Sequence, residues 1–356
     1  MGTEEQARDL LCKIPYPGLE RDIVSLGLVR SVEAGDDGVR ITLALASPRP
    51  DVLEKLRSRI HDRLAAAGLN PVHVEVASIG PSASTSDPWA RRGRLRGAGR
   101  IIAVGAGKGG VGKSTVAVNL ALGLRDSGWK VGVLDADIYG PSVPTMLGLE
   151  DGARQVRLTD DRKILPLEAH NVSVVSFGFF LGSGAPVVWR GPLVGKAVQQ
   201  FSRGVVWPEL DVLVVDLPPG TGDVPLSLAQ SVVVDGALVV TTPQRIAVLE
   251  AEKAAEMYGK LNVPLLGLVE NMSHADCTCG RRSHPFGRGG ADELAARLGR
   301  PVLGRIPFDE AEVEGGDRGR PALVSGPDGA AAEAFRTLAA GVRAHLEATV
   351  PEGAAS

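Results

Sequence analysis

The segment Gly107–Thr115 reads GKGGVGKST and matches the phosphate-binding pattern G-x-x-x-x-G-K-S/T at every position. The apolar run Ile101–Val104 precedes it, and the spacing that follows predicts a helix over Ser114–Ser127. Glycines let backbone N–H groups turn inward around phosphate oxygens, and the helix N-terminus adds a favourable dipole. The segment therefore predicts a nucleotide site in which Lys113 reaches the β and γ phosphates and the Ser114 hydroxyl binds Mg²⁺.

Every residue of this loop is expected to contact the nucleotide. The set is Gly107, Lys108, Gly109, Gly110, Val111, Gly112, Lys113, Ser114 and Thr115. The chain has no Asn-Lys-x-Asp guanine motif, which favours ATP over GTP. A P-loop kinase acting on a small molecule stays open as an alternative, because an acceptor pocket is not visible in a sequence.

Two acidic motifs end predicted strands further along the chain. They read VGVLDADIYGPS at 131–142 and VLVVDLPPGTGD at 212–223. Asp216 ends a valine-rich run, where a carboxylate that holds the hydration shell of Mg²⁺ is expected. Asp135 and Asp137 lie two positions apart after another strand, so we expect both to face the same cleft.

Three cysteines, Cys12, Cys277 and Cys279, are too few and too unevenly spaced for a disulfide framework. The C-x-C pair at 277–279 indicates metal chemistry more than a bridge. One alternative is zinc, because His274 and His284 flank the pair and would complete two sulfur and two nitrogen ligands. Another is that both thiols have no metal role. Cys12 is expected to be an ordinary small residue.

The composition sets outer limits on what the chain can be. With 356 residues, 44% of them hydrophobic and 23% charged, it predicts a folded protein of two domains and excludes a disordered chain. The formal net charge of −3 argues against a general polyanion binder. No apolar run approaches the roughly 20 residues that span a bilayer, and the first residues are acidic, so we expect a cytoplasmic protein without a membrane partner.

Residues 4–78 predict a small α+β domain in the order helix, two strands, helix, strand. Apolar side chains alternate over 39–45 and 72–76, as in half-buried strands. Between these strands, apolar residues recur at helical spacing over 53–64, with Asp51 as the expected N-cap and Gly68 as the stop.

Residues 79–99 predict a basic linker, since a loop-like composition is followed by five arginines over 91–100. This arm either stays solvated or touches nucleic acid or an acidic partner; the acidic net charge of the chain favours the solvated linker. From residue 100 to 348, short apolar runs alternate with helical segments. The runs are Ile101–Val104, Val131–Leu134, Val172–Val175, Val212–Val215, Leu238–Val240, Leu265–Val269 and Pro301–Ile306. This pattern predicts an α/β domain with a doubly wound, mostly parallel sheet and ligands at the carboxyl ends of its strands.

The loop carries a second lysine, Lys108, and in this it resembles the deviant Walker A ATPases, the group of MinD, ParA and ArsA. The resemblance implies that Lys108 reaches the phosphates of a partner protomer in a nucleotide-sandwich dimer, as an arginine finger does. It also implies that Asp137 orients the attacking water, that Asp135 lies nearer the metal, and that Asn271 contacts adenine. The catalytic residues would then be Lys108, Lys113 and Asp137.

The wording of four motifs narrows the resemblance to the Mrp/ApbC family of iron–sulfur cluster carrier ATPases. They are DADIYGPS at 135–142, DLPPGTGD at 216–223, TTPQ at 241–244 and ENMS at 270–273. The likeness covers about residues 98–345. The stretch DIVSLGLVRSV at 22–32 resembles the small iron–sulfur assembly domain that is fused to bacterial members.

The family resemblance implies a homodimer that carries a 4Fe–4S cluster between protomers and passes it to apo-proteins. The implied partners are these apo-proteins and cluster assembly factors. Family members hold the cluster on a C-x-x-C pair from each chain; here the pair is Cys277 and Cys279, one residue closer. Two chains would still supply four thiolates. Arg49 stands where related small domains often carry a cysteine, so that domain is expected to supply no ligand. The alternative function is a MinD/ParA-type positioning switch without a cluster, against which the small, acidic ending HLEATVPEGAAS argues.

Overall fold

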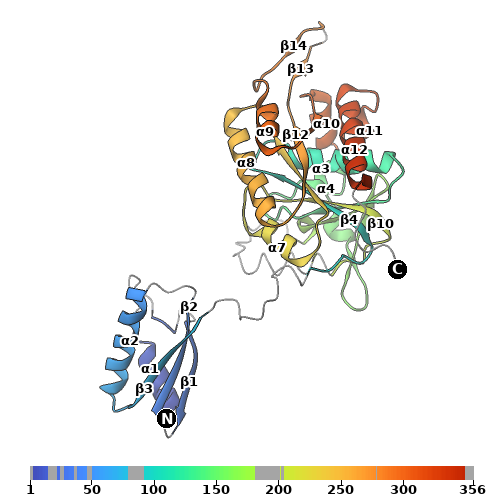
Figure 1. The fold of residues 1–356 in the computed structure, drawn as a ribbon. Helices are drawn as coiled ribbons and strands as arrows, with labels where there is room; N and C mark the ends of the chain where they lie inside the picture. Colours follow the sequence, from blue (N-terminus) through green and yellow to red (C-terminus); the bar gives the residue numbers. More distant parts are fainter. Residues whose placement is uncertain are drawn as a thin grey trace. The chain divides into compact units, whose positions relative to one another are not determined.

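The chain forms two compact units, Met1–Asp87 and Pro88–Ser356. The computed structural model describes residues 3–14, 22–24, 28–35, 38–45, 50–78, 92–180, 201, 204–277 and 279–348 (Figure 1). Arg49, Arg91 and most of the predicted linker lie outside these ranges.

The first unit is an α+β fold with the predicted order of elements. Its helices and strands are α1 (Thr3–Leu11), β1 (Val29–Gly35), β2 (Gly38–Leu45), α2 (Pro50–Ala65) and β3 (Val72–Ser78). The strands lie in the order β1-β2-β3, with β1 antiparallel and β3 parallel to β2. Side chains of α1, α2 and β2, among them Leu11, Ile41 and Ile60, form its buried core.

The ends of α2 show one prediction that is right and one that is wrong. The helix begins at Pro50, so Asp51 is its second residue and not the N-cap that we expected. Proline suits this first position because its fixed φ fits the helix and its missing N–H would have had no helical partner. Gly68 does stop the helix: its φ is +80°, and the N–H of Leu69 donates to the Leu64 carbonyl at 3.1 Å.

The second unit is built on one eight-stranded sheet. The strands are β4 (Ala98–Ala106), β5 (Val131–Asp135), β8 (Leu167–Ala169), β9 (Val172–Ser176), β10 (Leu210–Asp216), β11 (Gly236–Thr241), β12 (Leu265–Glu270) and β15 (Val302–Arg305). Their order is β15-β12-β11-β4-β10-β5-β9-β8, and every neighbouring pair is parallel except β8 and β9. The predicted, mostly parallel sheet is confirmed, and the short antiparallel edge strand β8 was not foreseen.

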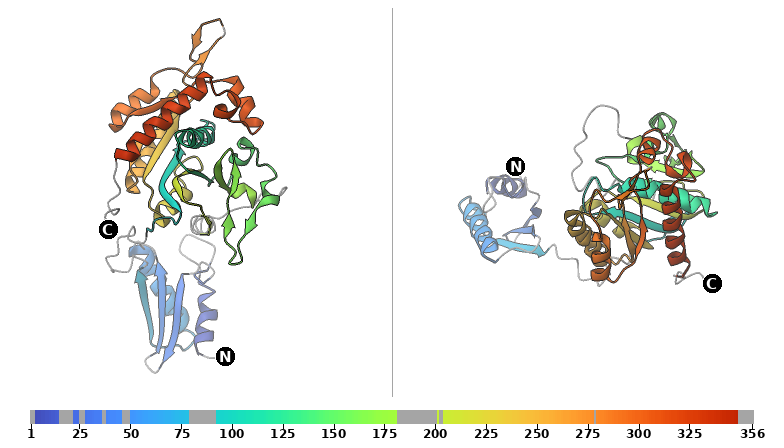
Figure 2. Two further views of the ribbon diagram at one scale, coloured as in Figure 1. Left: turned by 90° about the vertical axis from the view of Figure 1, so that its right-hand side faces the viewer. Right: turned by 90° about the horizontal axis from the view of Figure 1, so that it is seen from above.

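Helices cover both faces of this sheet (Figure 2). They are α3 (Lys113–Asp126), α4 (Val143–Met146), α5 (Gly152–Gln155), η1 (Phe177–Phe179), α7 (Asp223–Ser231), α8 (Arg245–Lys260), α9 (Gly290–Leu298), α10 (Glu310–Asp317), α11 (Ala322–Ser325) and α12 (Ala330–Ala348). Along β10, Leu213 and Val215 join the core under α8, whereas Val212 and Val214 join the core under α3 and α12. This alternation confirms the doubly wound prediction. In the described ranges, no helix has both the length and the apolar character needed to cross a membrane.

Two short hairpins extend from this layered body. One pairs β6 (Arg157–Leu158) with β7 (Ile164–Leu165), and the other pairs β13 (Ala275–Asp276) with β14 (Arg282–Ser283). The second hairpin follows β12 and projects beyond the layers of the unit (Figure 1).

Residues 92–99, which we expected to belong to the linker, are part of the second unit. Leu95 is buried in its core, and Gly93 bridges to Val232. The Arg94 guanidinium donates two hydrogen bonds to the Asp235 carboxylate, at 3.0 and 3.3 Å, and the Arg92 guanidinium donates to the Leu261 carbonyl at 2.5 Å. Two of the five arginines are therefore used to anchor the start of the sheet.

The packing of α12 on α3 generates a stability prediction. Gly123 of α3 lets α12 come close, and Phe335 of α12 is fully buried there. Phe335→Ala should lower the free energy of unfolding by about 3–5 kcal/mol, because a large cavity remains. All four tryptophans lie at position 88 or later, so tryptophan fluorescence during urea unfolding reports the second unit. Glu333→Ala, at an exposed site of α12, is the control and should change stability little; equal effects would contradict this packing account.

Candidate functional site

The loop between β4 and α3 has the backbone that a phosphate cradle needs. Gly110 and Gly112 adopt φ values of +79° and +76°, which other residues rarely take. A Cβ on Gly107 would lie 2.0 Å from the carbonyl carbon of Glu250, so only glycine fits against α8. The N-cap residue of α3 is Gly112, which has no side chain that could cap the helix. The first N–H groups of α3 are therefore available to an anion.

Lys113 is the centre of a buried charge cluster at the carboxyl ends of the strands. Its side chain is 6% exposed, and its Nζ lies 2.5 Å from Asp216 Oδ1, 3.6 Å from Asp137 Oδ2 and 3.1 Å from Ser114 Oγ. The structure thus brings together the loop lysine and two of the three predicted aspartates. Lys108 is half-buried, and its ammonium has no hydrogen-bond or ion-pair partner in the part of the chain that the structure describes.

Asp135 joins this cluster because β5 and β10 are parallel neighbours in which Asp135 stands beside Asp216. The Ser176 hydroxyl donates to Asp135 Oδ2 at 2.8 Å, and the Asp137 N–H donates to Asp135 Oδ1 at 3.1 Å. Sequence reasoning missed Ser176. Its signal was its position directly after the apolar run of β9, where a parallel strand delivers a side chain to the same edge.

Burial dominates the electrostatics of the two innermost carboxylates. It raises the pKa of Asp135 to about 7, with the negative charge of Asp216 adding to the shift. Burial also raises the pKa of Asp216, against the opposing effect of Lys113. Asp216 Oδ2 is buried and accepts no hydrogen bond from the described residues. This oxygen and the Ser114 hydroxyl are hard donors of the kind that Mg²⁺ takes, so the residues present fit that ion.

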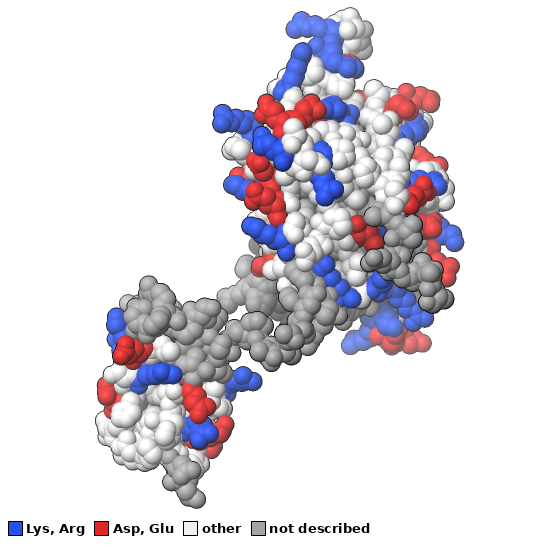
Figure 3. Space-filling model, in the orientation of Figure 1, with Lys and Arg blue, Asp and Glu red and all other residues white. Residues whose placement is uncertain are grey.

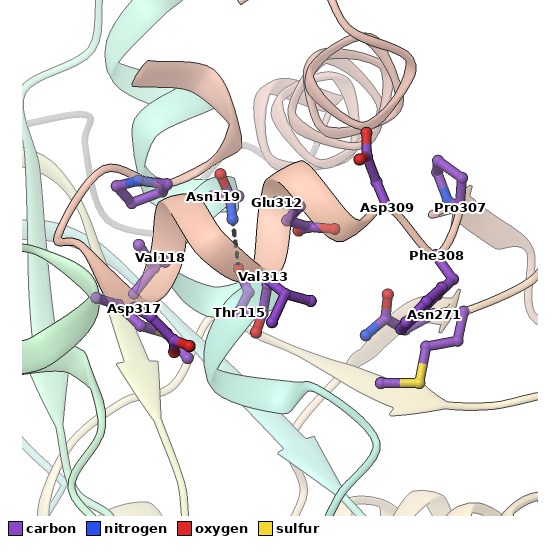
Figure 4. Close-up of a pocket in the computed structure, with 14 residues that line it drawn as sticks. Thr115, Val118, Asn119, Asn271, Pro307, Phe308, Asp309, Glu312, Val313 and Asp317 are labelled. Carbon is purple, nitrogen blue, oxygen red and sulfur yellow. Dashed lines mark hydrogen bonds between the residues drawn. The ribbon is translucent and has the colours of Figure 1, made fainter. Parts of the chain in front are cut away.

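A cavity of about 190 Å³, a size that suits a nucleobase, opens beside α3 (Figure 4). Its wall is formed by α3, α10, the residues that follow β12 and the loop that follows β15. The lining residues are Thr115, Val118, Asn119, Met146, Asn271, Met272, Pro307, Phe308, Asp309, Glu312, Val313, Gly316, Asp317 and Pro321. Asn271, which the family resemblance predicts to contact adenine, donates from Nδ2 to the Val111 carbonyl at 2.9 Å and is thereby fixed against the phosphate loop. The residues after β15 were missed, although their place behind an apolar run was a signal.

Cys277 and Cys279 lie at the tip of the β13–β14 hairpin, and both are exposed. The Cys277 N–H donates to the Arg281 carbonyl at 2.9 Å, and the Gly280 N–H donates to the Cys277 carbonyl at 2.8 Å. The Cys279 N–H points at Cys277 Sγ, 3.4 Å away. The tight turn therefore presents both thiols on one small surface. Cys12, in the first unit, is exposed and belongs to no such arrangement among the described residues.

The histidines of the zinc alternative stand nearer the base of the same hairpin. Their ring centroids are 6.2 Å apart, and each ring already contacts Ser273: His274 Nδ1 lies 2.8 Å from its hydroxyl and His284 Nδ1 lies 3.0 Å from its carbonyl. Within the described ranges, no group of three or more His, Cys, Asp or Glu side chains is arranged to hold a metal ion. One chain therefore does not assemble the four-ligand zinc site.

The raised pKa of Asp135 generates a prediction about stability and pH. The folded chain keeps this proton up to about pH 7, whereas the unfolded chain loses it near the ordinary value of 3.8. The Asp135 contribution to the free energy of unfolding therefore falls between about pH 4 and pH 7 and is constant above that range. Asp135→Asn should become more stable relative to the wild type across this interval, in urea titrations without Mg²⁺ or nucleotide. A difference that does not depend on pH would contradict the assignment; Asp211→Asn, at a solvent-exposed position of β10, is the control.

Comparison with known proteins agrees with this geometry. Residues 97–343 match the family model described as NUBPL iron-transfer P-loop NTPase, and residues 4–76 match the model described as iron-sulfur cluster assembly protein. Proteins named iron-sulfur cluster carrier protein are similar over most of the chain. The one from Deinococcus radiodurans is 42% identical and covers 92% of this chain and 91% of its own. The one from Escherichia coli is 39% identical, over 94% of this chain and 90% of its own.

Solved structures place the sheet unit in the same group. A nucleotide-binding protein from Archaeoglobus fulgidus, solved in complex with ADP, is 40% identical and covers 64% of this chain and 89% of its own, with a TM-score of 0.56. The cell division ATPase MinD of Pyrococcus furiosus is 25% identical, over 69% of this chain and 99% of its own, with a TM-score of 0.52. The family match over residues 97–343 and the relatives near 40% identity lead to one conclusion: the chain belongs to the NUBPL family of iron-transfer P-loop NTPases.

Proposed function

We propose that this protein is an ATP-hydrolysing, homodimeric carrier that binds a 4Fe–4S cluster and transfers it to apo-proteins. One observation carries the proposal: the base of the cysteine hairpin is hydrogen-bonded to the wall of the cavity beside α3. We assign this cavity to the base of the nucleotide and call it the nucleobase cavity. The Phe308 N–H donates to the His274 carbonyl at 2.6 Å, and the Ser273 N–H donates to the Ile306 carbonyl at 2.9 Å. Asn271, which lines the cavity, is only six residues before Cys277. A change at the nucleotide is therefore passed to the thiols over a short, bonded path.

Nucleotide hydrolysis would use the buried charge cluster. Lys113 would leave Asp216 for the β and γ phosphates, and the uncapped N–H groups of α3 would hold the same oxygens. Ser114, Asp135 and Asp216 would hold Mg²⁺, which neutralises the phosphate charge that develops during transfer. Asp137, 3.6 Å from Lys113, would orient the attacking water. Its orientation is fixed because Asp137 Oδ1 accepts a hydrogen bond from the Gly140 N–H at 3.2 Å.

The homodimer is supported by apolar side chains that remain exposed around the nucleotide edge of the sheet. Tyr139 follows β5, Leu226 lies in the first turns of α7, and Ile246 and Leu249 lie in the first turns of α8. All four follow the carboxyl ends of sheet strands, the edge at which the phosphate loop also lies. A partner protomer seated on this edge would bury them, and the unpaired Lys108 would then reach the partner's phosphates.

The cluster is the cargo in this proposal, and Cys277 and Cys279 are its ligands. Each protomer supplies two thiolates, so a dimer supplies the four that a 4Fe–4S cluster takes. Arg281 is exposed and adjoins Cys277, whose N–H donates to its carbonyl, and basic side chains cover the projecting hairpin (Figure 3); they would offset the negative charge of the thiolate-ligated cluster. Because these thiols must stay reduced, we propose that the protein works in the cytoplasm.

The positioning-switch alternative has less support. The relatives with about 40% identity over most of the chain are cluster carriers by name, whereas the MinD structure is 25% identical and covers 69% of this chain. Nucleic-acid binding through the arginine-rich stretch is also less favoured, since Arg92 and Arg94 are used inside the sheet unit. We propose that residues 4–78 are an assembly domain that receives or presents clients, that 79–91 connect it, and that 92–348 carry the ATPase.

Substitution of the two loop lysines should separate nucleotide binding from turnover. Lys113→Ala should lose both nucleotide binding and turnover, because this lysine would contact the phosphates of the nucleotide that its own chain binds. Lys108→Ala should keep ADP affinity within a few-fold but lose most ATP turnover, because its role is in the partner's site. Equimolar mixing of Lys108→Ala with Lys113→Ala should restore part of the activity if mixed dimers form. Calorimetric ADP binding and phosphate release are the measurements; full turnover by Lys108→Ala alone would rule out the role in trans.

Iron and acid-labile sulfide after anaerobic reconstitution test the carrier assignment. The wild type should hold about two of each per protomer, which is one four-iron cluster per dimer. The Cys277→Ser/Cys279→Ser variant should hold none while its ADP affinity is unchanged, because the thiols lie outside the nucleotide cavity. Cys12→Ser is the matched control and should keep the full content. A wild type that binds nucleotide but no cluster would contradict the carrier function.

A further inference from the structure

A buried glutamate stands in the wall of the nucleobase cavity. Glu312, on α10, is only 9% exposed, and its Oε1 accepts no hydrogen bond from any described residue. Figure 4 shows its side chain directed from α10 toward the side on which Asn271 and Phe308 lie. A buried carboxyl group without a hydrogen bond is costly, so its retention points to a ligand that completes it. Nothing in the predicted phosphate or metal chemistry uses this residue.

The charged side chains that line the cavity together with Glu312 are all acidic. Asp309 and Asp317 also line the cavity, and no basic side chain of the described residues does. The helices α4 and α11, which pack on α10, carry no titratable residue, and α3 contributes Thr115, Val118 and Asn119 to the cavity. Burial, with a smaller effect from Asp309, raises the pKa of Glu312 to about 8. Near neutral pH the group is therefore mostly a carboxylic acid, with one O–H donor and one C=O acceptor.

We propose that Glu312 reads the nucleobase, and that its neutral carboxyl group selects adenine over guanine. Adenine presents an amino donor beside a ring-nitrogen acceptor, and a carboxylic acid complements that pair with two hydrogen bonds. Guanine presents two adjacent N–H donors, which an ionised carboxylate would complement and a carboxylic acid would not. Asn271 then acts beside it: one hydrogen of its Nδ2 is used by the Val111 carbonyl, which leaves the second amide hydrogen and the oxygen for a base. The inference deepens the proposed ATP specificity and rests on the proposed function.

The selectivity should depend on pH in one direction. Below about pH 8 the carboxylic acid favours adenine. As the pH rises through about 8 the group ionises, loses its donor and becomes the complement of guanine, so the preference for adenine falls. The ratio of two dissociation constants isolates this effect, because ADP and GDP carry the same diphosphate and the phosphate loop treats them alike.

The test is calorimetric binding of ADP and of GDP to the full chain at about pH 6.5, 7.5 and 8.7, values on both sides of the Glu312 pKa of about 8. For the wild type, the preference for ADP should fall about tenfold across this range. Glu312→Gln keeps one donor and one acceptor at every pH, so it should retain the preference and lose its pH dependence. Glu312→Leu should lower the preference about tenfold at pH 6.5 and also lose the pH dependence. Glu310→Gln, on the same helix, should behave as the wild type.

Two outcomes are separated by this design. If the wild type binds ADP with a preference that neither Glu312 variant changes, Glu312 does not read the base and the inference is overturned, while the nucleotide site stands. If the wild type binds neither ADP nor GDP, the proposed function fails instead. Tryptophan fluorescence during urea unfolding checks that each variant is folded, and Glu312→Gln, which keeps the shape of the side chain, remains informative if Glu312→Leu does not fold.

Discussion

The buried ion pair between Lys113 and Asp216 is the contact around which the sheet unit is organised. A lysine and a carboxylate with almost no access to water are tolerated only when they face each other closely, here at 2.5 Å. That distance requires β4 and β10 to be parallel neighbours, with the phosphate loop turning back over their carboxyl ends. Asp135 enters the same space through β5, and its raised pKa follows from the burial that the pair demands. The order of the central strands, the backbone of the loop and the electrostatics of the site therefore all follow from this one ion pair.

The nucleobase cavity connects this charge cluster with the cysteine hairpin. Asn271 touches the phosphate loop on one side, and the chain continues from it through two more residues to His274, where the hairpin is bonded to the loop of Phe308. Phe308 and Glu312 line the same cavity as Asn271, so a base bound there as proposed would meet all three. Few residues thus separate the cavity from the thiols. A small displacement of the cavity wall by a bound nucleotide would therefore also displace the hairpin.

The sequence revealed the parts of the site that depend on local patterns, and it missed those that depend on distant contacts. Lys113 and Asp216 were found because a loop motif and a valine-rich strand mark them. Ser176 and Glu312 were missed because their roles arise from strand order and from helix packing, which no short window contains. Asp51 was assigned to a cap because its type suits one, but the proline before it starts the helix earlier. The long α12 and the edge strand β8 lack a distinctive motif and were not foreseen for the same reason.

The hairpin of β13 and β14 consists of strands only two residues long, and such a pair is barely stable by itself in water. Apart from the hydrogen bonds of its own turn and those to Ser273, it is held by the bond from Phe308 to His274 at its base and by the bidentate contact between Arg282 and Asp276 halfway along. Opening these contacts exposes little apolar surface and leaves the eight-stranded sheet intact. The spacing of Cys277 and Cys279 can therefore change by local unfolding, at a free energy far below that of unfolding the domain. Loading and release of cargo at the tip would then be limited by this small opening, independently of how stable the rest of the protein is.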